Sequence, residues 1–147
     1  MSSFQIIVGS MLGGTEYVGE ACQETLETIN HQTKIHLLPD FAQIPSKDQT
    51  WLICTSTHGA GDYPDNIQTF VDNLIHTEND LSSLKFFVIG IGDTSYDTFC
   101  YAAKNIRNIL LSNGCEEIVK FKSFDMQQEI DPEVESQTWI LANKDHL

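Results

Sequence analysis

The spacing of apolar and polar positions changes repeatedly along the chain, from short continuous apolar runs to longer stretches with helical periodicity. Runs in which nearly every residue is apolar predict strands that are buried on both faces of a sheet. Stretches with apolar residues three or four positions apart predict amphipathic helices. We expect strands at residues 4–8, 34–38, 50–55, 86–89 and 117–122. We expect helices at residues 15–30, from 64 onward, at 97–112 and at 131–144.

This alternation predicts an α/β fold in one domain, residues 1–147: a doubly wound, five-stranded parallel sheet with helices on both faces. For the strand order 2-1-3-4-5, ligands bind beyond the carboxyl ends of the strands, beside the point where the order reverses. Three glycine-rich loops follow the first, third and fourth expected strands. We therefore expect all three loops to meet at one edge of the sheet and to form a single binding site.

The first two expected helices have clear faces. The apolar face of the first comprises Val18, Cys22, Thr25 and Ile29. Its opposite face comprises Glu16, Glu20, Glu24 and Glu27. No basic residue precedes Lys34, so this acidic face is either a solvated surface or a docking surface. The apolar face of the second comprises Ile67, Phe70, Val71, Leu74 and Ile75.

The last two helices carry recognisable end signals. We expect the third to bury Phe99, Ala103, Ile106 and Leu110. Asp97 is its expected N-cap, and Asn113-Gly114 is its expected C-cap. Asp131 is the expected N-cap of the last helix, with Pro132 at the first helical position.

The first loop suits a phosphate group. Glycines allow a tight turn and close approach of backbone N–H groups, and a helix N-terminus adds a partial positive charge. Ser10 and Thr15 add hydroxyl donors, although an ordinary strand-to-helix turn would look similar. The loop is neither a P-loop nor a G-x-G-x-x-G motif. The candidate binding residues are Ser10, Met11, Leu12, Gly13, Gly14 and Thr15.

The second loop suits the edge of a flat ring. Its small residues let the backbone lie against a ring and present N–H and C=O groups to it. The peptide at Gly59 can rotate at little cost because glycine has no Cβ. His58 either stacks on the ring or is a surface histidine. The candidate binding residues are Ser56, Thr57, His58, Gly59, Ala60 and Gly61.

The third loop adds an aromatic ring and acidic groups. Tyr96 is placed to stack on a flat ligand, or else it packs against the protein. Asp93 and Asp97 place carboxylates nearby, and anions close to a ring disfavour adding negative charge to it. The candidate binding residues are Gly92, Asp93, Tyr96, Asp97, Phe99 and Cys100. Together the loops describe a pocket for a flat, anionic, aromatic ligand.

Net charge and composition limit the classes of partner that the protein can bind. A net charge of -13 argues against nucleic-acid binding and suits steering toward basic proteins, although acidity alone also keeps a protein soluble. No apolar run reaches the roughly 18 residues of a membrane span, and no signal peptide is evident. The four cysteines form no C-x-x-C pair, so we expect core thiols in a reducing cytoplasm.

Other protein classes with this architecture need functional residues that this chain lacks. A phosphoacceptor receiver domain needs acids after the first and third strands, where this chain has Gly9-Ser10 and Ser56-Thr57. A low-molecular-weight tyrosine phosphatase needs a Cys and an Arg around the first loop, which has neither. No Cys/His set has zinc spacing, so no metal is expected, and no G-x-S-x-G elbow is present.

The three loop sequences, residues 9–17, 56–66 and 92–100, resemble those of the flavodoxin family. Within that family the chain is most similar to the short MioC-type flavodoxin-like proteins, and the resemblance spans almost the whole chain. Flavodoxin with FMN is the standard example of the 2-1-3-4-5 binding rule. The resemblance implies non-covalent FMN, with residues 10–15 holding the phosphate, Gly59 turning toward the flavin N5 and Tyr96 stacking on the outer ring face.

The resemblance implies a cytoplasmic, monomeric electron carrier rather than an enzyme. It would take electrons from a flavin/NADP reductase-type donor and pass them to an acceptor metalloenzyme through the flavin semiquinone and hydroquinone, docking by its acidic surface. Leu12 and Gly14 stand where hydroxyl residues are frequent, and His58 stands where Trp or Tyr is frequent, so phosphate affinity and ring packing differ from the usual pattern. Two alternatives stay open: an interaction module with weak or lost FMN binding, and a direct reductase, for which no nicotinamide site is evident.

Overall fold

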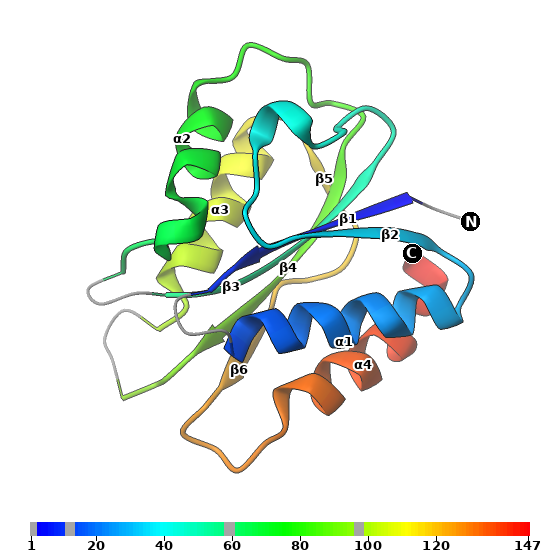
Figure 1. Cartoon of the computed structure of the whole chain (residues 1–147), viewed down its shortest axis with the longest axis vertical. Helices are drawn as coiled ribbons and strands as arrows, with labels where there is room; N and C mark the ends of the chain where they lie inside the picture. The colour runs from blue at the N-terminus through cyan, green and yellow to red at the C-terminus, as the bar shows by residue number, and fades with distance from the viewer. Residues whose placement is uncertain (1–2, 11–13, 58–60, 96–98) are drawn as a thin grey trace.

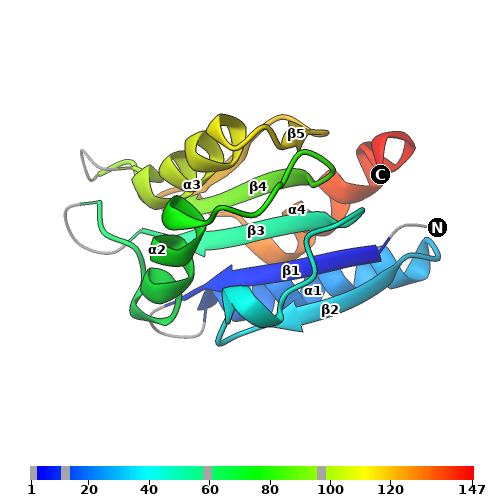
Figure 2. The same cartoon turned by 90° about the horizontal axis from the view of Figure 1, so that it is seen from above.

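The sheet sets the layout of the molecule. The structure is a computed structural model that describes residues 3–10, 14–57, 61–95 and 99–147. Its strands are β1 (Ser3–Gly9), β2 (Gln32–His36), β3 (Thr50–Ser56), β4 (Lys85–Gly92), β5 (Glu116–Glu117) and β6 (Lys122–Asp125). All pair in parallel in the order β2-β1-β3-β4-β5, with β6 also beside β4, and Figure 2 shows this order across the molecule. The predicted strand order is confirmed.

Helices cover both faces of the sheet, as predicted. The α-helices are α1 (Gly14–Thr28), α2 (Gln68–His76), α3 (Tyr101–Ser112) and α4 (Pro132–Ala142). Short 3-10 turns are η1 (Phe41–Gln43), η2 (Asp65–Ile67) and η3 (Lys144–His146). α1 and α4 lie side by side on one face, and α2 and α3 lie on the other (Figure 1). In the described part of the chain, no helix is long and apolar enough to cross a membrane.

Two hydrophobic clusters fill the two layers. Alternate residues of the central strands point to opposite faces. Leu52 and Cys54 therefore pack toward α1 and α4, whereas Trp51 and Ile53 pack toward α2 and α3. All four cysteines are buried and free, so the prediction of core thiols is confirmed. The buried thiol pKa values are raised by desolvation, that of Cys22 to about 12.

The prediction of one continuous fifth strand at residues 117–122 is wrong in detail. The chain there forms two short strands, β5 and β6, with a bulge between them. Glu116 pairs with Lys85 and Lys122 pairs with Ile89, so the chain advances six positions between these pairs while β4 advances four. Val119 packs in the cluster beneath α1 and α4, whereas Phe121 packs against the opposite cluster. A regular strand would place both side chains on one face. The bulge therefore places these two apolar side chains in different layers.

Several helix boundaries differ from the expected ones. α3 begins at Tyr101 and not at residue 97, with Cys100 in the N-cap position, so the predicted N-cap role of Asp97 is wrong. Residue 64 opens the 3-10 turn η2, and α2 follows only from Gln68. Ile75, which we expected on the buried face of α2, is exposed.

The predicted N-cap of α4 and the predicted C-cap of α3 are confirmed. Asp131 accepts hydrogen bonds from the backbone N–H groups of Glu133 and Val134 at the start of α4. α3 ends with Gly114 at a φ of 82°, and the N–H of Cys115 donates to the carbonyl of Leu110. This is a Schellman C-cap, in which a residue with positive φ closes the helix.

Candidate functional site

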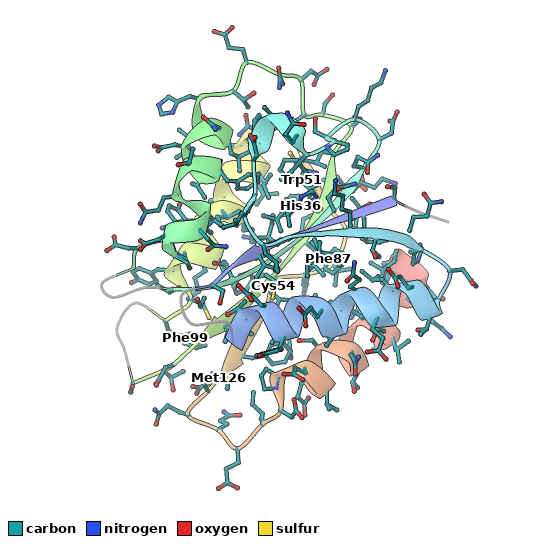
Figure 3. All side chains as sticks on the ribbon, viewed as in Figure 1. His36, Trp51, Cys54, Phe87, Phe99 and Met126 are labelled. Carbon is teal, nitrogen blue, oxygen red and sulfur yellow. The ribbon has the colours of Figure 1, made fainter. Side chains whose placement is uncertain are left out.

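A cavity of about 470 Å³ opens at the carboxyl edge of the sheet. The N-terminal turns of α1 and α4 form one side of it, and the segments that follow β1, β3 and β6 form the other. Its lining residues are Ser10, Gly14, Thr15, Tyr17, Val18, Ser56, Thr57, Ile91, Met126, Pro132 and Glu133. In Figure 3, Met126 and Phe99 lie toward the end of the molecule where β6 ends and α1 begins, while Trp51 lies far from them.

Strand register brings the starts of the three candidate loops together. Gly9 of β1 pairs with Thr55 of β3, and Ser56 of β3 pairs with Ile91 of β4. The residues that follow these pairs leave the sheet at the same level. Among the described candidates, Ser10, Gly14, Thr15, Ser56 and Thr57 meet in the cavity.

The start of the first loop is fixed by Asn66, a residue of η2. The Asn66 side-chain oxygen accepts from the Ser10 N–H at 3.0 Å. Its Nδ2 donates to the carbonyls of Val8, at 2.7 Å, and Leu37, at 2.9 Å. One amide thus joins the exits of β1 and β2 to the second loop region. Asn66 was not among the candidates expected from the sequence, because its contacts lie 29 to 58 positions away in the chain.

Close packing also fixes this loop. A Cβ at Gly9 would collide with the Thr55 hydroxyl and would lie 2.7 Å from Ile67 Cδ1, so only glycine fits there. A Cβ at Gly14, by contrast, would meet nothing within 4 Å. α1 therefore begins at the cavity with its backbone uncovered by a side chain at position 14.

The second loop is tied to the start of α3. The Thr57 hydroxyl accepts from the backbone N–H of Ala102 at 3.1 Å. Since Cys100 makes no side-chain cap, Thr57 supplies a cap to α3 from another part of the chain. The accepting hydroxyl keeps its own hydrogen for donation. Ser56 donates to the Gly9 carbonyl at 3.4 Å, and Gly61 has a φ of 105°, which favours glycine.

The third loop is held by two carboxylates. Asp93 accepts from the N–H and hydroxyl of Ser95, at 2.8 and 2.6 Å, and from Gln127 Nε2 at 2.9 Å. Asp125 accepts from the N–H and hydroxyl of Thr94, at 3.1 and 2.6 Å. Hydrogen bonds from Ser95 lower the pKa of Asp93, and hydrogen bonds from Thr94 and Gln127 lower that of Asp125. The Asp93 carboxylate, predicted near a ligand, thus also orders its own loop.

Gly92, Phe99 and Cys100 form the base of the third loop. A Cβ at Gly92 would lie 2.8 Å from Cys100 Sγ and 2.9 Å from Phe99 Cδ1. Cys100 is fully buried, with a φ of 55°, and desolvation raises its thiol pKa to about 11. Phe99 lines a second cavity of about 380 Å³ beside β6, with Thr94, Lys122 and Asp125 among its other lining residues.

The main cavity combines hydroxyl groups with an apolar wall. Ser10, Thr15, Ser56 and Thr57 contribute the hydroxyls. Tyr17, Val18, Ile91, Met126 and Pro132 contribute the apolar wall. None of these wall residues, nor Glu133, was expected in the site from the sequence. Tyr17 and Val18 could have been found from the helix period, since they lie one turn beyond Gly14. Met126 reaches the cavity because β6 pairs with β4 and the Met126 N–H donates to the Gly92 carbonyl. Pro132 and Glu133 reach it through the packing of α4 on α1.

The remaining candidates lie outside the described residues. They are Met11, Leu12, Gly13, His58, Gly59, Ala60, Tyr96 and Asp97. Within the described ranges, no group of three or more His, Cys, Asp or Glu side chains could hold a metal ion.

Comparisons with known proteins agree on one family. The family model described as Flavodoxin matches residues 6–139. The chain is 38% identical to the Protein MioC homolog of Pasteurella multocida over 135 residues, which cover 92% of this chain and 91% of that protein. It is 36% identical to Protein MioC of Escherichia coli K12 over 140 residues, 95% of each chain. A solved flavodoxin from Pseudomonas aeruginosa, a cysteine-to-alanine mutant, superimposes with a TM-score of 0.90 at 25% identity, covering 99% of this chain and 98% of that one.

Proposed function

The chain belongs to the flavodoxin family of electron-transfer flavoproteins, and from this premise we propose that it binds one FMN without a covalent bond at the carboxyl edge of its sheet. It then carries electrons from a NAD(P)H-linked flavin reductase to an acceptor metalloenzyme. The observation that carries the proposal is the hydroxyl-lined cavity at the N-terminus of α1, where the first two candidate loops meet.

The described residues fit the phosphate and ribityl parts of FMN. A helix N-terminus with an uncovered backbone attracts an anion. The 15-residue α1 begins at Gly14 on the cavity wall, with Ser10 and Thr15 beside it. A cavity of about 470 Å³ also falls within the usual range of roughly 300–1,000 Å³ for ligand pockets. Ser10 and Thr15 would hold the phosphate, and Ser56 and Thr57 would hold the ribityl hydroxyls.

The flavin ring would lie between the second and third loops. His58 and Tyr96 would contact its two faces, and the Gly59 peptide would lie beside the flavin N5. Bound FMN would supply a ring that accepts and releases electrons. The chain's own residues would orient this ring, because Thr57 anchors one loop and Asp93 and Asp125 brace the other. Hydrogen bonds that hold a loop before the ligand arrives reduce the conformational entropy lost on binding.

The acidic face of α1 would meet the redox partners. Glu20, Glu24 and Glu27 are exposed along this helix, whose N-terminus lies at the cavity. A carboxylate surface beside the cofactor would attract basic proteins and steer their approach. Electrons would then cross between cofactors brought close by this contact.

A reconstituted electron-transfer assay tests the proposal. FMN-loaded protein is mixed with NADPH, an NADPH-dependent flavoprotein reductase and a basic haem protein as a model acceptor. We expect haem reduction to require all four components and to rise with the concentration of the FMN protein. Equal haem reduction with and without the FMN protein would contradict a carrier role. Rapid NADPH oxidation without the reductase would indicate the direct-reductase alternative.

A second candidate function is an interaction module that has lost tight FMN binding. Glu133 favours it, because this carboxylate lines the cavity in which a phosphate would bind. The visible spectrum of the purified protein separates the two. A yellow protein with flavin absorption supports the carrier, and a colourless protein that takes up no added FMN supports the interaction module.

A further inference from the structure

Two helix N-termini meet at the main cavity, and they differ in the side chains that they present to it. α1 and α4 pack side by side on the same face of the sheet (Figure 1). Gly14 and Thr15 of α1 and Pro132 and Glu133 of α4 all line the cavity. At α1, the first residue carries no side chain, and the one acid of the first turn, Glu16, does not line the cavity. At α4, the first turn carries two acids, Glu133 and Glu135.

The α4 N-terminus already has an anion from the chain itself. Asp131 accepts from the N–H of Glu133 at 3.0 Å and from that of Val134 at 3.3 Å. These bonds occupy N–H groups that would otherwise attract a ligand anion. α4 therefore offers the cavity a carboxylate where α1 offers uncovered backbone.

The charge of the cavity wall follows from its residues. Among the described lining residues, Glu133 is the only acidic one, and none is Lys or Arg. The phosphate of FMN carries close to two negative charges at neutral pH, as other phosphomonoesters do. A carboxylate in the same cavity opposes this charge, and no basic side chain of the described wall offsets it.

We propose that Glu133 sets the flavin specificity of this site, lowering the affinity for the phosphorylated flavin FMN relative to uncharged riboflavin. The inference rests on the proposed function, because it concerns the same cavity. Glu133 has a second effect, since an acid in the first turn also stabilises α4. The test must therefore separate repulsion of the phosphate from stability of the helix.

Glu133→Gln removes the charge and keeps the shape of an exposed side chain. Glu135→Gln is the matched control: it removes an exposed acid from the same first turn, but this residue lines the second cavity and not the main one. Apoprotein of the wild type and of both variants is titrated with FMN and with riboflavin, and binding is followed by quenching of flavin fluorescence. Thermal unfolding of the three apoproteins reports the change in helix stability.

We expect Glu133→Gln to lower the dissociation constant of FMN by about threefold to tenfold, the size expected for one carboxylate acting through water on a doubly charged group. Riboflavin affinity should change by less than about twofold, since it has no phosphate. Glu135→Gln should leave the ratio of the two affinities as in the wild type. Raising the salt concentration should reduce the gain in FMN affinity.

Three results would overturn the inference. An equal change for both flavins in Glu133→Gln would indicate a structural effect. Binding of both flavins with no effect of Glu133→Gln would overturn the specificity role alone. Wild-type protein that binds neither flavin would overturn the proposed function itself.

Discussion

At the scale of single residues, two glycines of the site have opposite surroundings. A Cβ at Gly92 would lie 2.8 Å from Cys100 Sγ, beneath the third loop. We predict that Gly92→Ala lowers the free energy of unfolding by about 1–3 kcal/mol, as overpacking does, and weakens FMN binding by displacing the loop. Urea unfolding of the apoprotein and an FMN titration measure the two effects.

Gly14→Ala is the control for this substitution. Its added Cβ would meet nothing within 4 Å, and position 14 opens α1, where alanine is favourable. We expect it to leave the unfolding free energy of the apoprotein unchanged or slightly higher. If Gly92→Ala were as stable as Gly14→Ala, the packing beneath the third loop would not be as tight as described.

His36 couples stability to pH. Desolvation, with Lys34 nearby, lowers its pKa below the ordinary value of 6.5. Its Nε2 lies 2.7 Å from the Gln5 side-chain oxygen, so the neutral ring donates there. Because the unfolded chain binds this proton more readily, the contribution of His36 to stability is complete above pH 6.5 and is lost as pH falls toward the folded pKa.

We predict that His36→Gln makes unfolding less sensitive to pH between about 7.5 and 5.5 than it is in the wild type. Denaturant unfolding at several pH values measures both curves. The difference between them isolates the histidine, because both proteins share the relief of acidic repulsion as pH falls. Parallel curves would show that His36 titrates alike in the folded and unfolded states.

At the scale of elements, Asn66 joins η2 to the exits of β1 and β2. Asn66→Ala would leave the Ser10 N–H and two carbonyls without this partner. We predict a loss of about 1–3 kcal/mol in unfolding free energy and weaker FMN binding, because half-buried groups lose their hydrogen bonds and the first loop loses its anchor. Urea unfolding and FMN titration measure both.

Asn73→Ala, at an exposed position of α2, provides the comparison for this change. It removes the same kind of side chain at a distance from the cavity, and we expect a change within about 0.5 kcal/mol. A similar effect of the two substitutions would mean that the Asn66 bonds contribute little to the site.

The sequence predicts the elements whose signals are local. The central strands are continuous apolar runs, and Asp131 and Gly114 mark helix ends by their own chemistry. The start of α3 could not be predicted this way, because its cap comes from Thr57 on another loop. The bulge between β5 and β6 likewise follows from the need to bury Val119 and Phe121 in different layers.

The residues of the site also divide into those marked by local sequence signals and those placed only by tertiary contacts. Ser10, Thr15, Ser56 and Thr57 directly follow strands or open a helix, so topology and motif place them at the carboxyl edge. Met126 and Glu133 also line the cavity, but tertiary contacts bring them there: β6 pairs with β4, and α4 packs on α1. A wall built by tertiary packing carries no motif in the sequence, which is why these residues were not predicted.

At the scale of the whole molecule, the net charge of -13 dominates encounter with partners. We predict that electron transfer to a basic acceptor slows as ionic strength rises, because salt screens surface fields beyond about 10 Å at 0.1 M. Stopped-flow rates at several salt concentrations measure this. Replacing Glu20 and Glu24 by Gln should reduce the salt dependence if the acidic face of α1 is the docking surface.

A salt dependence unchanged in this double variant would place the docking surface elsewhere, and rates independent of salt would remove steering altogether. Glu78→Gln with Glu116→Gln is a matched control that removes two exposed acids elsewhere on the molecule. We expect it to change the salt dependence less than the α1 pair does, because long-range steering depends on charge near the contact.

The most direct test of the account is to map FMN binding residue by residue, using backbone amide NMR shifts of the labelled apoprotein. We predict saturable changes at one equivalent of FMN, concentrated at Ser10, Thr15, Thr57, Gly92 and Asp93. Residues at the other end of the sheet, such as Gln49 and Lys85, should hardly change. Shifts centred on that opposite edge, or none at millimolar FMN, would contradict the claim that this edge of the sheet holds the cofactor.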